Sequence, residues 1–186
     1  ASGLSHAYHR NVDWRLVARL APAGMLGGAM GAYLLANVDG KAIEPFVSAY
    51  LIVIGLVILY KAFRPPPKRD VRDWIVPPVG LFGGLLDAIG GGGWGPIVTS
   101  SLVSRGHDLK RVIGSTNFTE FAVTLTISLT FVATLGWSQL NSAIGLIIGG
   151  VIAAPLGAIL VTRLPVRPLM VAVSMIIIAT SAIRIL

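Results

Sequence analysis

Long apolar stretches separated by short polar breaks dominate this sequence of 186 residues. Residues 20–38 and 45–60 contain no charged side chain, and neither does the 42-residue stretch 121–162. A bilayer core is about 30 Å thick, so a helix needs roughly 20 mostly apolar residues to cross it. Because the stretches do not alternate with period two, strands are not expected. The pattern predicts an all-α integral membrane protein, a multi-span helical bundle of about six segments.

Two of the predicted segments contain features that a regular helix does not favour. Residues 74–104 are interrupted by Asp87 and a glycine tract, and residues 112–134 by Glu120. The stretch 121–162 is too long for one crossing, and its polar residues 136–141 predict a turn. A final apolar segment covers residues 168–183. The bundle is therefore expected to contain broken helices.

Composition supports a membrane protein and excludes other classes. Hydrophobic residues make up 54% of the chain, charged residues only 12%, and the mean hydropathy is +0.79. Soluble domains carry about twice that share of charge, and disordered chains are far less apolar. The net charge of +7 comes from basic residues at the ends of apolar runs, as membrane topology requires. We therefore expect the lipid bilayer as a partner and no nucleic acid.

The chain divides at a proline-rich basic linker, residues 64–73, and shows a partial internal repeat. Four positions near residue 24 recur at an offset of 126: Gly24, Gly31, Ala32 and Leu34 align with Gly150, Gly157, Ala158 and Leu160. Residues 1–63 are interpreted as the C-terminal half of a first repeat, with two helices, and residues 74–186 as a second repeat with four. Such repeats are typical of secondary transporters.

This interpretation implies that the opening part of the first repeat is missing from the chain. The alternative is a non-transporting membrane subunit, or half of a split transporter that needs a partner chain. The missing repeat segment and a second copy in a homo-oligomer are both candidate partners. An in-frame apolar extension before Ala1 would indicate truncation, whereas a neighbouring short gene would indicate a split system.

The densest motif is the glycine tract from Gly90 to Pro96. Each glycine costs about 1 kcal/mol relative to alanine in a helix interior, so the helix is predicted to break there. Backbone freed within a membrane must be buried in protein or line a wet cavity. Pro96 suits the first turn of a resumed helix, whose amide groups would attract an anion. A tight helix crossing or bend is the alternative.

A second polar motif runs from Gly114 to Asn117, at the expected start of an apolar helix. Its hydroxyl and amide groups can donate to an anion or cap exposed amides, and polar contacts between helices are the simpler alternative. With the glycine tract, this motif defines the substrate-binding residues we expect. They are Gly91, Gly92, Gly93, Trp94, Gly95, Pro96, Gly114, Ser115, Thr116 and Asn117.

Asp87 and Glu120 are the acidic residues that lie well inside apolar stretches. Intramembrane carboxylates are energetically costly and mark functional sites. Proton coupling is one role for them, and a structural role bracing the glycine break is another. An anion site disfavours unpaired carboxylates, so each is expected to be protonated or bonded to amides, hydroxyls or a basic residue.

Other motifs predict packing rather than chemistry. Small residues four apart, such as Gly24 with Gly28 and Gly80 with Gly84, favour close helix contacts. The glycine tract also fits a dinucleotide pattern, but the surrounding βαβ unit is lacking. The three histidines show no metal-ligand spacing, and no nucleophile is paired with a base. We expect no enzyme activity, no cofactor and no metal site.

The stretches from Gly83 to Pro96 and from Arg105 to Asn117 resemble the sulfite exporter TauE/SafE family, also called the TSUP permeases. The glycine-rich segment after residues 11–14 is also similar to the interior of that family's first repeat. The resemblance implies a bacterial inner-membrane, multi-pass permease, a secondary transporter for sulfite, sulfonates or other small sulfur-containing or organic anions. Family members are typically built from two four-helix repeats, and this sequence lacks the glycine-rich entry of the first.

Overall fold

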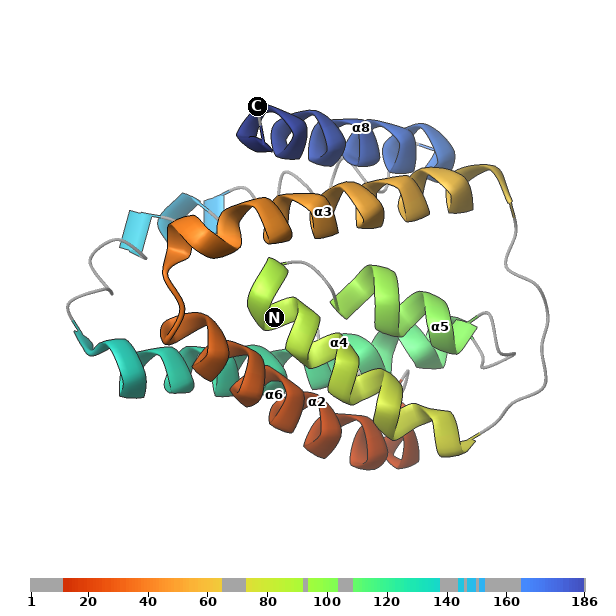
Figure 1. Ribbon diagram of the computed structural model, residues 1–186. Coiled ribbons are helices and arrows are strands. Elements are labelled where there is room, and N and C mark those ends of the chain that lie inside the picture. Colours follow the sequence, from red (N-terminus) through yellow and green to blue (C-terminus); the bar gives the residue numbers. More distant parts are fainter. Residues whose placement is uncertain are drawn as a thin grey trace. The chain divides into compact units, whose positions relative to one another are not determined.

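The computed structural model describes residues 12–64, 73–91, 94–103, 109–137, 144–145, 147–149, 151–152 and 165–185. Within those residues all regular structure is helical (Figure 1). This confirms the predicted all-α fold class. Most of the proline-rich linker and most of residues 138–164 lie outside the described part, so the predictions made for them stay predictions.

The chain forms two compact units, each built from segments distant in sequence. The first contains residues 1–42 and 66–131, and the second contains residues 43–65 and 132–186. The repeats predicted for residues 1–63 and 74–186 were defined by similarity within the sequence, whereas these two units are defined by spatial contacts. The division into repeats therefore stays a prediction.

The first unit begins with helix α2, Trp14–Ala36. The Asp13 side chain caps this helix, because its Oδ1 accepts hydrogen bonds from the backbone N–H groups of Arg15 at 3.0 Å and Leu16 at 3.3 Å. A cap of this kind satisfies donors that have no partner within the helix. The helix ends at Asn37, whose side-chain amide donates to the Tyr33 carbonyl at 2.8 Å.

Helix α4, Val76–Gly90, follows a short 3₁₀ turn, η1, at Asp73–Ile75. Prolines occupy its first turn, where their missing N–H groups are not needed. The helix ends at Gly91, which adopts the left-handed conformation with φ of 69°. Only glycine adopts this conformation without steric cost, and the Gly91 N–H closes the last turn on the Asp87 carbonyl at 2.8 Å.

Helices α2 and α4 cross with their backbones in close contact. A Cβ on Gly31 would lie 2.6 Å from the Leu85 carbonyl oxygen, and one on Gly80 would lie 2.9 Å from that of Leu20. A Cβ on Gly27 or Gly84 would clash with the backbone of the opposite helix. The small residues therefore allow the helices to approach closely, as the sequence predicted.

The helix breaks after Gly91 and resumes as a wide π-type turn, η2, at Trp94–Thr99. One regular turn follows, α5, at Ser100–Val103. This confirms the predicted break in the glycine tract. Pro96 lies at the third residue of the resumed segment.

Helix α6, Leu109–Leu135, is 27 residues long and completes the first unit as far as Phe131. Val123 and Ile127 of this helix pack beside Gly24 and Gly28 of α2. A buried cluster links these elements. It consists of Leu16, Leu20, Val76, Trp94, Val98, Leu102, Val112 and Val123.

The second unit contains helix α3, Gly40–Phe63, which enters it at Ile43, and helix α8, Val166–Ile185. Gly55 of α3 faces α8, because an added Cβ would lie 2.6 Å from the Ile178 side chain and 3.3 Å from the Ser174 carbonyl. Ser48, Ser174 and Ser181 are buried. Small residues therefore also mediate this helix contact.

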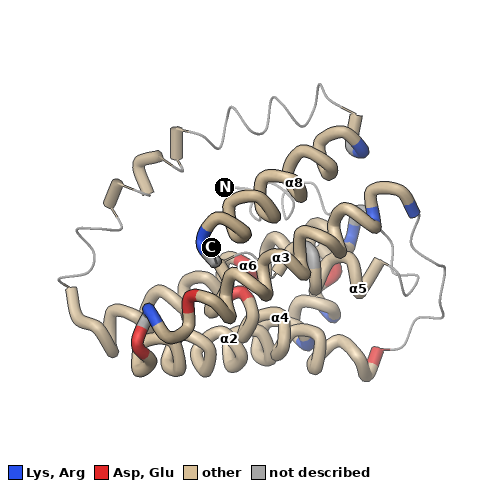
Figure 2. Tube along the Cα trace, turned by 45° about the horizontal axis from the view of Figure 1, so that its top comes forward, with Lys and Arg blue, Asp and Glu red and all other residues tan. Residues whose placement is uncertain are grey.

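Three described helices are long and apolar enough to cross a membrane, Lys41–Phe63, Arg111–Leu135 and Arg167–Arg184. Most of each helix carries no charge (Figure 2). Three is fewer than the six segments expected. Helix α4 is only 15 residues long before the break. Some of the six predicted membrane segments fall on residues outside the described part.

Gly84→Ala is expected to lower the stability of the protein, because the added methyl group meets the Gly24 carbonyl and the Gly28 nitrogen across the helix crossing. Overpacking of this kind costs about 1–3 kcal/mol, against the gain of about 1 kcal/mol that alanine brings within a helix. Thermal unfolding of the detergent-purified protein measures the difference.

Gly149→Ala is the matched control, since a Cβ there has no atom within 4 Å. This variant is expected to be as stable as the parent or more so. Equal stability of the two alanine variants would contradict the close α2–α4 contact.

Candidate functional site

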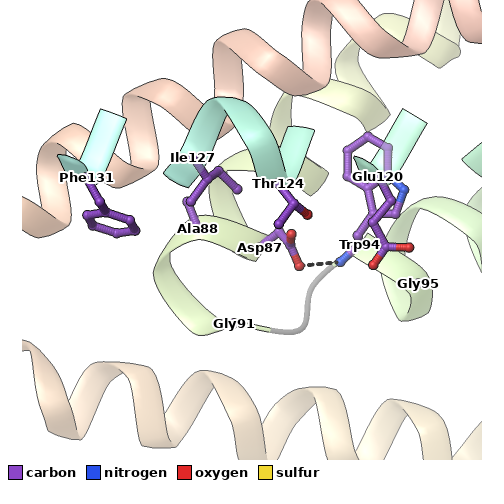
Figure 3. A pocket seen from close by; sticks show the side chains of 9 residues that line it. All are labelled: Asp87, Ala88, Gly91, Trp94, Gly95, Glu120, Thr124, Ile127 and Phe131. Atoms are coloured by element: carbon purple, nitrogen blue, oxygen red, sulfur yellow. Dashed lines mark hydrogen bonds between the residues drawn. The ribbon is translucent and has the colours of Figure 1, made fainter. Parts of the chain in front are cut away.

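A cavity of about 540 Å³ lies in the first unit, beside the break between α4 and η2. Its wall is formed by the end of α4, the start of the resumed segment and one face of α6 (Figure 3). The lining residues are Asp87, Ala88, Gly91, Trp94, Gly95, Glu120, Thr124, Ile127 and Phe131. Three residues from the predicted glycine-tract site, Gly91, Trp94 and Gly95, therefore line one cavity.

Asp87 joins the two sides of the break. Its Oδ1 accepts a hydrogen bond from the backbone N–H of Trp94 at 3.2 Å (Figure 3). The carboxylate therefore bonds to one of the amides exposed at the start of the resumed segment. Asp87 thus bonds to an amide, one of the partners expected from the sequence, and whether its role is structural or in proton coupling stays a prediction.

Trp94 forms the buried wall of the cavity, with only 1% of its surface exposed. Its indole Nε1–H donates to the Thr116 carbonyl of α6 at 3.1 Å. A buried indole N–H needs such a partner. The following residue, Gly95, is exposed and has no atom within 4 Å of an added Cβ.

Glu120 reaches the cavity from α6, so that two carboxylates from different helices line the same space. Both residues are half-buried. Among the described lining residues none is Lys or Arg. Two ionised carboxylates in one cavity would repel an anion, so positive charge has to accompany any anion that binds beside them.

The stripe of α6 that lines the cavity continues beyond the residues predicted from sequence. Thr124, Ile127 and Phe131 follow Glu120 at helical spacing. These three residues and Ala88 were not predicted to be site residues. The sequence could have indicated Thr124, because it follows Glu120 by four residues and residues four apart lie on the same face of a helix.

The polar motif from Gly114 to Asn117 was expected at the start of a helix, but it lies inside one. Helix α6 begins at Leu109, so these residues lie in its second turn and do not cap it. No clear boundary is visible in the sequence here, because residues 109–111 are good helix formers. Gly114, Ser115 and Thr116 are buried, Asn117 is half-buried, and none of them is among the described lining residues.

Ser115 and Thr116 form hydrogen bonds within the protein. The Ser115 hydroxyl accepts from the backbone N–H of Asp13, at the start of α2, at 2.8 Å. The Thr116 hydroxyl donates to the Val112 carbonyl at 2.8 Å and accepts from the Thr99 hydroxyl at 3.1 Å. The motif thus connects α6 to α2 and to the resumed segment, as the alternative of polar interhelical contacts predicted.

Two predicted site residues, Gly92 and Gly93, lie outside the described residues, as does the side chain of Pro96. No group of three metal-ligating side chains occurs among the residues that the structure describes. The described site therefore consists of a helix break, an amide bonded to a carboxylate, and a half-polar cavity.

Comparison with known proteins gives a family match over almost the whole chain. A family model described as "Sulfite exporter TauE/SafE" matches residues 1–184. A relative from Bacillus subtilis (strain 168), described as "Probable membrane transporter protein YtnM", is 36% identical over 174 residues. The alignment covers 88% of this chain and 57% of that relative, so the chain spans little more than half of the relative's length. No solved structure matches the chain.

Ser115→Ala is expected to lower the free energy of unfolding by about 1–2 kcal/mol, because the Asp13 N–H loses its partner next to the α2 cap. Ser128→Ala is the matched control in the same helix. Its hydroxyl is exposed and bonds only to the Thr124 carbonyl one turn earlier. Equal thermal stability of the two variants would show that the Ser115 contact does not support α2.

Proposed function

We propose that this chain, which belongs to the sulfite exporter TauE/SafE family, forms part of a membrane permease for small sulfur-containing or organic anions such as sulfite or sulfonates. The transport class is supported by the family and by the relative described as a probable membrane transporter. We further propose that it acts as a secondary transporter in the bacterial inner membrane.

The observation that carries this proposal is the cavity of about 540 Å³ beside a broken helix. Irregular backbone in an apolar bundle is tolerated where it lines a cavity, and broken helices form solute sites in transporters. The Trp94 N–H bonds to a carboxylate, so this amide attracts a negative group. The anion would bind along the start of the resumed segment, where Gly95 faces open space.

The two cavity carboxylates lead to a proposal about coupling. An anion that enters beside Asp87 and Glu120 meets like charge unless a proton enters with it. We propose that one or both of these carboxylates bind the coupled proton. These two are the titratable side chains among the described residues that line the cavity.

Gly95→Cys provides a direct test of anion access, because the natural chain contains no cysteine and the added side chain has room. Labelling of the introduced thiol by a sulfonate-bearing methanethiosulfonate is expected in membranes. Sulfoacetate at saturating concentration is expected to slow the labelling severalfold, because both compounds occupy the same cavity. Mass spectrometry of the intact protein gives the labelling rate.

Gly149→Cys is the matched control, since it also faces open space but does not line the cavity. Its labelling rate is expected to be insensitive to sulfoacetate. If sulfoacetate, sulfite and carboxylates all left the thiol of the Gly95→Cys variant unprotected, the anion site proposed at this cavity would be wrong.

Coupling is tested by flux into proteoliposomes with an imposed pH gradient. Sulfite flux by the parent protein is expected to follow the gradient, whereas Glu120→Gln and Asp87→Asn are expected to reduce that dependence while retaining exchange of labelled sulfite. The amide side chains keep size and hydrogen bonding but cannot carry the proton. Parent flux that ignores the gradient would rule out proton coupling.

A further inference from the structure

The resumed segment after the glycine tract is attached to two different helices through one residue. The Trp94 backbone N–H donates to Asp87 Oδ1 of α4 at 3.2 Å, and its indole N–H donates to the Thr116 carbonyl of α6 at 3.1 Å. Further along the segment, the Thr99 hydroxyl donates to the Thr116 hydroxyl oxygen at 3.1 Å. Three hydrogen bonds thus fix a short segment whose own helical pattern is irregular.

The Trp94 ring occupies a space that Gly24 leaves open, and it also lies within van der Waals reach of Gly83. A Cβ on Gly24 of α2 would lie 2.6 Å from ring atom Cη2, and one on Gly83 of α4 would lie 3.6 Å from ring atom Cε3. Val123 of α6 belongs to the same buried cluster as Trp94, and the indole N–H bonds to the Thr116 carbonyl of that helix. The ring is therefore enclosed by three helices, and its 1% exposure reflects this packing.

Thr116 accepts both of the bonds that come from the resumed segment to α6. Its side chain is buried, with 1% exposure, and its hydroxyl proton is directed to the Val112 carbonyl at 2.8 Å. The same hydroxyl oxygen accepts the bond from Thr99. Thr116 is therefore placed to hold the segment rather than to contact a solute.

We infer that Asp87, Trp94, Thr99 and Thr116 form a latch that fixes the resumed segment as one wall of the cavity. This inference rests on the proposed function of the cavity. Within it, Trp94, Thr99 and Thr116 are positioning residues. They set the distance between the start of the segment and the carboxylates, and hence the space available to an anion.

The latch also connects the cavity to the packing of the whole first unit. Because the Trp94 ring fits between α2, α4 and α6, displacement of the segment has to expose the indole. Exposure of Trp94 therefore reports whether the latch is closed, independently of any substrate.

The experiment uses a protein in which Trp94 is the only tryptophan. The chain has four tryptophans, and Trp14, Trp74 and Trp137 are 59%, 69% and 76% exposed, so each is changed to Phe. Acrylamide quenching of Trp94 fluorescence is then measured with Thr99→Val, which keeps the shape of the side chain but lacks the hydroxyl. Thr99→Ser, which retains it, is the rescue variant.

Thr99→Val is expected to raise the exposed population of Trp94 about fivefold, the change that loss of one neutral hydrogen bond produces. Thr99→Ser is expected to restore the low quenching of the parent. Thr126→Val is the matched control, because its hydroxyl bonds only within α6, to the Ala122 carbonyl at 2.9 Å. Unchanged quenching in Thr99→Val, or an equal rise in Thr126→Val, would overturn the latch.

Sulfite flux in proteoliposomes separates positioning from general stability. Thr99→Val is expected to raise KM with kcat little changed, and Thr99→Ser is expected to return KM to the parent value. A Gly95→Cys thiol that sulfoacetate, sulfite and carboxylates all leave unprotected would contradict the proposed anion site, while the quenching results still decide the latch. A parent that transports, with KM unaffected by Thr99→Val, would contradict the role of the latch in positioning the cavity.

Discussion

Satisfying backbone polar groups in an apolar setting is the constraint on which this structure depends. A helix that breaks within a membrane exposes N–H and C=O groups that lipid cannot hydrogen-bond. At the break between α4 and the resumed segment, the Gly91 N–H turns back to the Asp87 carbonyl and the Trp94 N–H bonds to the Asp87 side chain. One acidic residue thus contributes to both sides of the interruption, which explains its presence in an apolar helix.

Small residues meet a second constraint on this structure. They let the helices pack closely and still leave space for a bulky aromatic side chain at the cavity wall. Glycines at the α2–α4 crossing let the backbones approach, Gly24 leaves room for the Trp94 ring, and Gly83 leaves room for the Val98 side chain. Membrane helices associate through such packing rather than through the hydrophobic effect. The same small residues therefore stabilise the first unit and shape the wall of its cavity.

Electrostatics and family membership together frame the proposed chemistry. The chain belongs to a family described as sulfite exporters, yet the charged side chains among the described lining residues of the cavity are carboxylates. A site in which the described amide already bonds to one of two acidic groups favours an anion only when positive charge is present. This combination makes coupled binding of a proton and an anion the natural proposal for the cavity.

The sequence alone determined the helical membrane class, the break in the glycine tract and the close-packing role of the small residues, because these depend on local composition and spacing. It also identified Asp87 and Glu120, since charge in an apolar stretch is conspicuous. Only the tertiary structure decided which residues meet. It placed Ser115 and Thr116 in interhelical bonds, away from the cavity, and brought Thr124, Ile127 and Phe131 into its lining. Local sequence could not reveal this, because the side of a helix that faces the cavity depends on packing against segments that are distant in the sequence.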